Sequence, residues 1–375
     1  MNNLHYPSLS IAPRDGDSPF VDAAAVDAWD AWFRWRDHGT LRDLTVDATW
    51  DRVATALASV ESAGSALTWK RRFSDAFASW QLLLDERILA TAGTEQNGWA
   101  GDGLVAVLNV AAFVRAPSTL QASFDQVAFE ELAALAVRAL DDAAELAASQ
   151  APVDSGFRIG IIGLADALAL LGLAYDRADG RALAELAARS LAQGCQRGSS
   201  QLACERGAPA PCTEAWRLRA RAQEVASEII VEAERKGIRH RCLTAITSQP
   251  RLALFANNVA DALDPFINAS RPDHATASDP QRVVPGRTHA IAPNHLPIYS
   301  PQGSALDCTA SVAAQLALRA AMRNWLDEPI DYPLLVDGEP GEKQLALWAA
   351  MVAQIGLPQA RWRQPDHRVR TTPLA

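Results

Sequence analysis

Residues 157–176, FRIGIIGLADALALLGLAYD, limit the possible folds of this chain more than any other stretch. The segment begins with a short apolar run around two glycines and continues with alanines and leucines that suit a helix. Few of its residues are polar, so we predict a short extended piece that runs into a buried helix. A strand that leads into a buried helix is typical of α/β proteins, in which helices cover a sheet.

Helical patterns occupy most of the remaining chain, so the predicted α/β fold is rich in helix. Helices are predicted at 124–149, 181–206, 214–236, 305–326 and 342–355. Strands are predicted at 104–114 and at the start of 242–259, which then turns at Gln249-Pro250 into a second apolar segment.

Aromatic residues mark the N-terminal part, because six of the eleven tryptophans lie within residues 29–80. Ser18-Pro19 supplies an N-cap and a proline at the first helical position, which predicts a first helix ending at His38-Gly39. A second helix carries Trp50, Val53, Leu57 and Val60 on one face, and a third carries Phe73, Phe77, Trp80 and Leu84. These rings predict the core of a helical region at 18–88, after a flexible lead at 1–17.

Charge and composition exclude several kinds of partner. The 375 residues carry a net charge of −9, so neither nucleic acid nor a membrane surface is an expected partner. No run approaches the ~20 apolar residues that cross a bilayer, and the N-terminus lacks the pattern of a secretory signal. Five scattered cysteines suggest no disulfide framework, so a cytoplasmic location is expected.

The glycines of residues 157–176 suggest a phosphate-binding loop, but the sequence around them lacks other features of such a loop. Gly160 and Gly163 stand before a helix, where backbone N–H groups can approach a phosphate. The third glycine and the downstream acidic residue of a dinucleotide site are missing. Close packing of the chain is therefore the favoured interpretation.

Metal-ligand spacing is also absent. Cys195, Cys204 and Cys212 are nine and eight residues apart, whereas paired zinc ligands are separated by two to four residues. His289 and His295 lie in a proline-rich stretch without an acidic neighbour. No metal site is predicted, and these histidines are expected to be solvated.

Five segments, taken together, point to a known family. They are FASWQLLLDERILATAGT (77–94), EQNGWAGDGLVAVLNVAAFV (95–114), FRIGIIGLADALALLGLAYD (157–176), LTAITSQPRLALFANNVADALDPF (243–266) and LDEPIDYPLLVD (326–337). In this order they resemble the large catalytic subunit of ribonucleotide reductase, especially the class II type that depends on adenosylcobalamin.

The resemblance implies a fold and a cofactor. Two family motifs that are normally separated by half of the barrel merge here in ATAGTEQ (90–96), so a shortened, degenerate reductase-type α/β barrel is expected at 89–375. Its residues 270–304 are expected to be a long proline-rich loop. Adenosylcobalamin is implied by the family alone, since no retained residue specifically indicates it.

This chain lacks residues that carry out the chemistry of the family. Members reduce a ribonucleotide with a thiyl radical on the cysteine of an N-x-C-x-E loop, and only a thiol gives a radical that can both abstract the ribose hydrogen and be regenerated. Aligned with that loop, Gly93 stands at the cysteine and only Glu95 is retained. The redox cysteines have no counterpart either. The resemblance therefore implies lost reductase chemistry, with Glu95 as the remaining candidate acid or base.

The phosphate turn is altered as well. The family's P-T-G-T turn, which presents backbone N–H groups and hydroxyls to the substrate phosphate, aligns with residues 248–251. Pro250 removes one donor and fixes φ, while Arg251 can still pair with an anion. The resemblance places the candidate nucleotide-binding residues at Asn109, Ser248, Gln249, Arg251, Asn257 and Asn258. The two adjacent asparagines suit equally well the capping of a turn.

Three functions remain open from the sequence. The favoured hypothesis is a non-catalytic homologue that binds a nucleotide or regulates a full-length reductase. The second is an active, adenosylcobalamin-dependent reductase fragment completed by a partner chain. The third is a purely structural or interaction protein, for which the aromatic helical region could form a homo-oligomeric interface.

Overall fold

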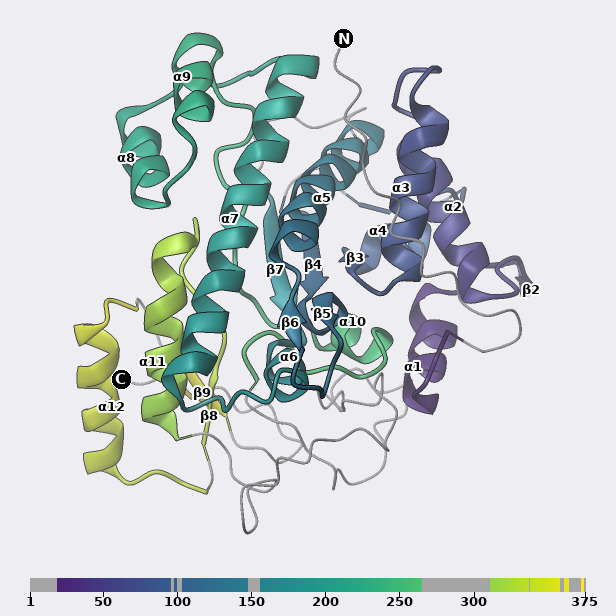
Figure 1. Cartoon of the computed structure of the whole chain (residues 1–375). Coiled ribbons are helices and arrows are strands. Elements are labelled where there is room, and N and C mark those ends of the chain that lie inside the picture. The colour runs from purple at the N-terminus through teal and green to yellow at the C-terminus, as the bar shows by residue number, and fades with distance from the viewer. Residues whose placement is uncertain are drawn as a thin grey trace.

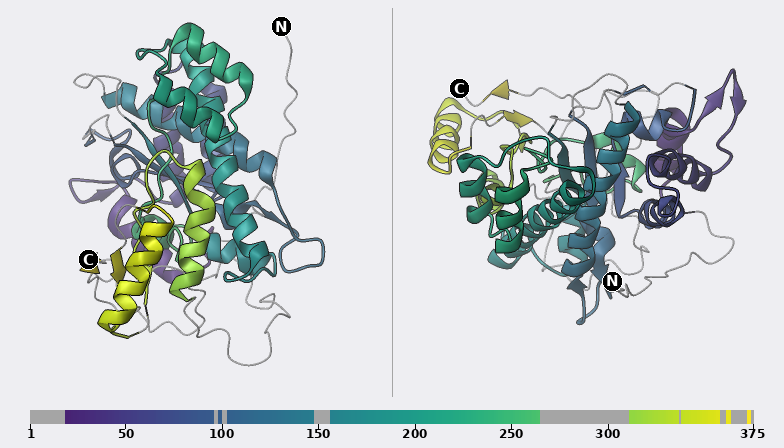
Figure 2. Two further views of the ribbon diagram at one scale, coloured as in Figure 1. Left: turned by 90° about the vertical axis from the view of Figure 1, so that its left-hand side faces the viewer. Right: turned by 90° about the horizontal axis from the view of Figure 1, so that it is seen from above.

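The computed structural model describes residues 19–95, 98–99, 103–147, 156–264, 311–336, 338–357, 361–363 and 372–373. The lead at 1–17, the proline-rich stretch at 270–304 with its two histidines, and Cys308 lie outside the described residues. Helices surround a small central sheet, with the N-terminal helices on one side and the C-terminal helices on the other (Figure 1, Figure 2).

The first helix, α1 (Ala23–Ala28), starts later than the sequence predicts. Its N-cap is Asp22, whose side chain accepts a hydrogen bond from the Ala24 N–H at 2.8 Å. The predicted start at Ser18-Pro19 is therefore wrong, because this carboxylate is the side chain that satisfies a free N–H of the first turn. A π-helical turn (Trp29–Phe33) and the hairpin of β1 (Arg36–Asp37) and β2 (Thr40–Leu41) follow.

Helices α2 (Val46–Ala58) and α3 (Ala66–Ala78) confirm the next two predicted helices, but α3 ends before Leu84. Trp80 has a left-handed φ of 56°, which a continuing helix does not allow. Strand β3 (Leu82–Leu84) follows, and all three of its leucines are buried. Burial of successive residues shows that both faces of this outer strand are covered, which an argument from helical spacing overlooks.

The central sheet has three named strands. Strand β4 (Val105–Asn109) lies in the middle, antiparallel to β3 and parallel to β7 (Arg158–Ile162). An isolated parallel bridge between Ile159 and Thr244 adds residues 243–247 beside β7, and a bridge between Thr247 and Asp331 continues the arrangement. The strand predicted within 104–114 is confirmed for its first half, after which a 3-10 turn (Val110–Phe113) begins.

The described strands form open sheets and close no barrel. Strands β8 (Leu334–Leu335), β9 (Arg361–Arg363) and β10 (Thr372–Pro373) form a second small sheet, and β5 (Val114–Arg115) pairs only with β6 (Ser123–Phe124). Most of these strands have two or three residues, too few to carry a continuous ladder around a barrel. The helix-rich α/β class is thus confirmed, whereas a barrel is not found in the described residues.

Two long helices, α5 (Gln126–Ala147) and α7 (Ala178–Arg206), cover one side of the sheet (Figure 1). They approach closely because α7 presents glycines. A Cβ on Gly194 would lie 2.3 Å from the carbonyl oxygen of Glu130, and one on Gly198 would lie 2.7 Å from that of Ala134. Any larger side chain at either position would force the two helices apart.

The predicted helix at 214–236 is two helices, α8 (Glu214–Ala222) and α9 (Ser227–Lys236). Glu224 has a φ of 53° and interrupts the helical path between them. Gly237 follows α9 with a φ of 98°, a conformation that favours glycine and ends the helix. The two helices have a small core of their own, which includes Trp216, Ile230 and Ile238.

The remaining helices are α4 (Glu86–Thr91), α6 (Leu164–Leu170), α10 (Pro250–Phe255), α11 (Val312–Met322) and α12 (Glu342–Gln354). Among the described residues, none of the helices combines the length and apolarity needed to cross a bilayer. One large core runs from Trp29 to Leu357 and includes both the N-terminal helices and the sheet. The aromatic rings of the N-terminal region lie in this core, as predicted. The ring centre of Phe255 lies 5.2 Å from that of Trp50 and 5.3 Å from that of Trp80.

Candidate functional site

Most of the candidate binding residues lie at or near one edge of the central sheet. Strand β4 ends at Asn109, and its register pairs that residue with Ile162 at the end of β7. Thr247 lies at the same level, because Thr244 is bridged to Ile159 three residues earlier. The carboxyl ends of parallel strands in open α/β sheets are where ligands usually bind. Ser248 and Gln249 follow directly at this strand edge.

Asn109 is buried at the strand edge with its Oδ1 atom unpartnered. Gly163, on the next strand end, has a φ of 70°, and a Cβ there would lie 2.3 Å from this oxygen. Gly160 is equally confined, since its Cβ would lie 2.6 Å from the carbonyl oxygen of Ala245. Both glycines therefore allow close approach of neighbouring chain segments, in agreement with the packing interpretation.

The turn that aligns with the family's phosphate turn is bonded to a carboxylate of the same chain. The Ser248 hydroxyl donates to Asp261 Oδ2 at 2.6 Å, and the Gln249 N–H donates to Asp261 Oδ1 at 2.7 Å. Asp261 is completely buried, and desolvation raises its pKa to about 6 although both hydrogen bonds act to lower it. Pro250 follows as the first residue of α10 and has no N–H to offer.

Arg251 is directed away from the turn. Its Nη1 donates to Glu86 Oε2 at 2.9 Å, and its guanidinium lies 5.0 Å from the ring centre of Trp32. Both side chains of the ion pair are about one third exposed. The structure therefore uses Arg251 to connect α10 with α4 and the N-terminal helices.

Asn257 and Asn258 bind the N-terminal segment. Asn257 Oδ1 accepts from the Val21 N–H at 2.9 Å, and its Nδ2 donates to the Pro19 carbonyl at 3.3 Å. Asn258 Nδ2 donates to Asp22 Oδ2 at 2.9 Å. Both asparagines have a φ of 61°, a conformation that asparagine tolerates better than most residues. Their amides thus fasten residues 19–22 onto the body of the protein.

Glu95 lies elsewhere, in a pocket of about 320 Å³ between the β1–β2 hairpin and the end of α4. The other lining residues are Arg34, Trp35, Arg36, Asp37, His38, Ala90, Thr91 and Thr94. Nearby, Gly93 has a φ of 73°, and a Cβ there would lie 3.0 Å from Arg52 Cγ. The structure therefore brings together Asn109, Ser248 and Gln249 at the strand edge but separates Glu95 from them.

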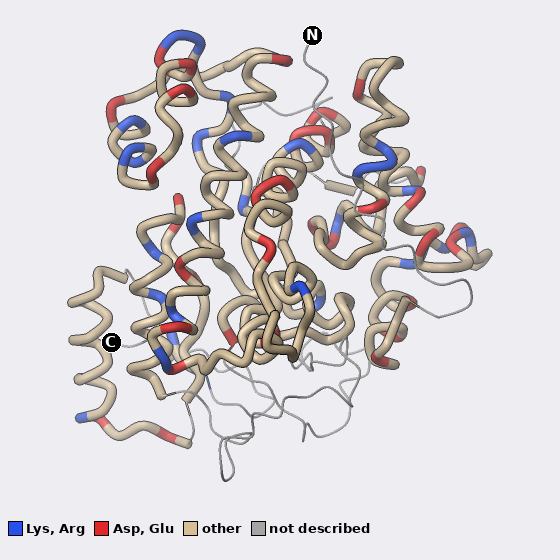
Figure 3. Tube along the Cα trace, in the orientation of Figure 1, with Lys and Arg blue, Asp and Glu red and all other residues tan. Residues whose placement is uncertain are grey.

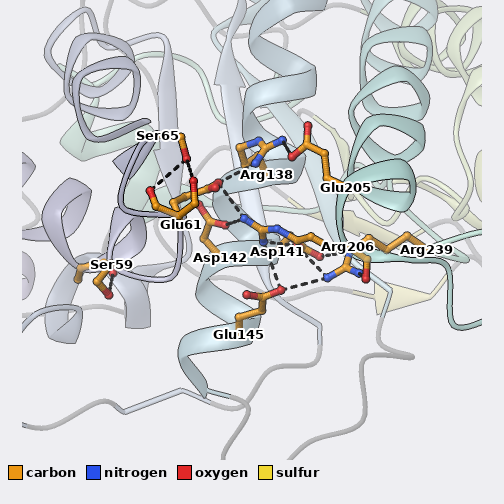
Figure 4. A network of polar contacts seen from close by, with 12 residues as sticks. Ser59, Glu61, Ser65, Arg138, Asp141, Asp142, Glu145, Glu205, Arg206 and Arg239 are labelled. Carbon is orange, nitrogen blue, oxygen red and sulfur yellow. Dashed lines mark hydrogen bonds and ion pairs between the residues drawn. The ribbon is translucent and has the colours of Figure 1, made fainter. Parts of the chain in front are cut away.

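A buried network of charged groups was not predicted from the sequence (Figure 4). Its carboxyl groups belong to Glu61, Asp141, Asp142, Glu145 and Glu205, and its guanidinium groups belong to Arg138, Arg206 and Arg239. Charges of both signs occur along α5 and α7 (Figure 3). The signal in the sequence is the adjacent pair Asp141-Asp142 within a helix rich in alanine and leucine, because buried acidic residues need partners.

The two adjacent aspartates of this network have pKa values shifted in opposite directions. Asp141 accepts from Arg239 Nε at 2.7 Å and from His240, and these bonds hold its pKa well below the usual range in spite of burial. Asp142 bonds Arg206 at 2.6 Å, but its Oδ2 has no partner, and desolvation raises its pKa to about 8. At neutral pH the first carboxyl is therefore ionised and the second is largely protonated.

Ser199, His240 and Asp141 form a chain of hydrogen bonds within this network. His240 Nε2 lies 3.1 Å from Asp141 Oδ1, and the ring's Nδ1 lies 2.9 Å from the Ser199 hydroxyl. Because a carboxylate only accepts, Nε2 carries the proton and the serine donates to Nδ1. All three residues are buried, and Ser199 and His240 line a pocket of about 20 Å³, which has room for a water molecule and not for a substrate.

The described cysteines lie away from the strand edge. Cys195 is buried where α7 faces Ala133 of α5, and Cys204 and Cys212 lie near the α8–α9 pair. Cys242 lies at the amino end of the 243–247 segment, and desolvation raises its pKa to about 12. Among the described residues, no cluster of three or more histidine, cysteine or acidic side chains could hold a metal ion.

The comparison with protein families agrees with the resemblance seen in the sequence. Residues 104–268 match the family model described as ribonucleotide reductase, barrel domain. This segment is ribonucleotide-reductase-like. It includes β4, α5, β7 and α6 to α10, and it is similar to part of the large subunit. A search of curated proteins gives no match.

Adenosylcobalamin does not fit the two pockets described above. Sites for drug-sized molecules have volumes of roughly 300–1,000 Å³, and this cofactor is much larger than a drug. The pocket beside Glu95 holds about 320 Å³, and the one beside His240 about 20 Å³. Neither of these two pockets of the reductase-like chain therefore accommodates cobalamin.

Proposed function

We propose that this ribonucleotide-reductase-like protein does not reduce nucleotides and acts by binding, in a regulatory role. The observation that carries the proposal is the separation of the described thiols from the strand edge. Cys242 precedes Ser248 by six residues of extended chain, and therefore lies about 20 Å from it at a rise of ~3.3 Å per residue. A radical thiol has to touch the ribose it attacks.

The protonation of the thiols supports the same conclusion. Burial raises the pKa of both Cys195 and Cys242, so neither is activated as a thiolate. Exchange of reducing equivalents between thiols needs thiolate character and access. Cys195 therefore has the features of an inert core residue, and the half-buried Cys242 has too high a pKa to act as a thiolate.

The surroundings of Gly93 also argue against a hidden radical site. Its left-handed backbone and the nearby Arg52 leave no relaxed position for a cysteine side chain. Glu95, the retained acidic residue, faces a polar pocket that no strand-edge residue lines. An acid or base acts only within hydrogen-bond reach of its substrate, so we propose no catalytic role for Glu95 at the strand edge.

Turnover tests the proposal directly. The full chain, incubated with ribonucleoside diphosphates, adenosylcobalamin and dithiothreitol, is expected to give no deoxynucleotide, while an active class II reductase in the same buffer gives product. Deoxynucleotide above the level of a heat-treated sample would refute the proposal. The same assay with added purified reductase measures regulation as a change in that enzyme's rate.

Ligand binding is a separate question that calorimetry answers. Titration with ATP, dATP and the four ribonucleoside diphosphates is expected to give micromolar binding for a nucleotide-regulated protein. Absence of heat would favour a purely structural or interaction role. The class II relationship and a cytoplasmic location stay predictions from the sequence.

A further inference from the structure

The turn at Ser248–Pro250 has the hydrogen-bonding character of an oxyanion site. Two donors, the Ser248 hydroxyl and the Gln249 N–H, converge on the two oxygens of a single carboxylate. The distances of 2.6 and 2.7 Å are typical of charge-assisted hydrogen bonds. The carboxylate belongs to Asp261, which lies twelve residues beyond Gln249 in the same chain.

The carboxylate is enclosed as a bound ligand would be. Asp261 has no solvent exposure, and its surroundings include the guanidinium of Arg363 as well as the carboxyl of Asp264. Arg363 is itself bonded to Asp264 Oδ2 at 2.9 Å and to the Tyr332 hydroxyl at 3.0 Å. The two donors of the turn and the Arg363 guanidinium therefore favour the ionised form of Asp261, while the Asp264 carboxyl acts against it.

We propose that the turn Ser248–Pro250 is an oxyanion-binding site whose ligand in this protein is the side chain of Asp261. The chain supplies its own anion at the strand edge, so this turn is closed to phosphate and carboxylate groups from outside. The inference goes beyond the proposed function, because it says which ligand chemistry the edge excludes. A nucleotide detected by calorimetry would then bind elsewhere, without contact between its phosphate and this turn.

Removal of the internal anion tests the inference. Asp261→Ala leaves both donors unpaired and opens space for a small anion. We expect formate or inorganic phosphate to raise the melting temperature of this variant by about 2 °C or more relative to chloride at equal ionic strength. The wild-type chain and an Asp176→Ala control, which removes an exposed carboxylate, are expected to respond equally to all three salts.

Two results would overturn the inference. One is an Asp261→Ala variant that folds and responds to formate and phosphate no more than to chloride. The other is a wild-type chain in which the Gln249 amide resonance shifts saturably with inorganic phosphate. The wild-type measurement also tests the inference if the Asp261→Ala variant does not fold. A Gln249 amide resonance that does not shift with phosphate supports a turn that is closed to external anions. Neither result depends on turnover, so failure of this inference is distinct from failure of the proposed function.

Discussion

Replacing Asp142 by asparagine should change how stability depends on pH. Asp142 is buried with one oxygen unpartnered, and Glu61 and Asp141 add to the desolvation that raises its pKa to about 8. The unfolded chain has a carboxyl pKa of about 3.8 at this residue. Between these values the folded protein binds a proton that the unfolded chain lacks, so the free energy of unfolding falls as pH rises.

The expected size follows from linkage. One proton bound only by the folded state gives a slope of about −1.4 kcal/mol per pH unit. From pH 5 to pH 8 the wild type should therefore lose about 3–4 kcal/mol that Asp142→Asn retains. His240 acts in the opposite direction below its unfolded pKa, because burial lowers its folded pKa. Both proteins contain His240, so subtracting their free energies of unfolding at each pH cancels most of the His240 contribution.

Urea unfolding followed by tryptophan fluorescence at pH 5, 6, 7 and 8 measures the effect. The matched control is Ser190→Ala, which removes a buried, unpartnered hydroxyl from α7 and adds or removes no titratable group. Its stability curve should run parallel to that of the wild type. Parallel curves for Asp142→Asn as well would refute the reasoning, since the carboxyl would then be ionised in the folded protein throughout this range.

Three further substitutions test the packing. Gly194→Ala should destabilise the protein by about 2 kcal/mol or more in urea unfolding, because the new Cβ meets the Glu130 carbonyl, and an unchanged midpoint would contradict the close helix contact. Phe255→Ala should cost about 3–5 kcal/mol in the same assay, since it empties the aromatic centre, and a loss under 1 kcal/mol would be inconsistent with that position. Asn257→Ala should remove about 1–2 kcal/mol and speed limited proteolysis before α1, whereas an unaltered cleavage pattern would show that this amide does not fasten the N-terminal segment.

Local patterns predicted the elements whose signal is strong over many residues. The strand and helix of 157–176 appear as β7 and α6, and the long alanine-rich helices appear as α5 and α7. The third predicted helix failed at its end, because Leu84 fits helical spacing as well as it fits a strand. Only the pairing of Leu84 with Ala106, a contact made far along the chain, selects the strand.

The sequence indicated candidate residues for the site but not the contacts that these residues make. The resemblance named Ser248 and Gln249 as candidate binding residues, and the strand predicted at the start of 242–259 puts them directly after its end. That Asp261 would occupy their donors depends on a loop conformation that periodicity does not describe. The buried network on α5 was missed for a related reason, because helical spacing alone does not reveal which neighbour brings Arg239 to Asp141.

The contacts of Asn257 with Pro19 and Val21 determine when the protein can complete its fold during synthesis. These partners are separated by 238 and 236 residues, so the start of the chain waits until the asparagine has emerged from the ribosome. At translation rates of about 5–20 residues per second, the delay is on the order of 10–50 seconds. During that interval Phe20 can contact Trp29 and Trp80 but not Phe255, so the aromatic centre stays incomplete.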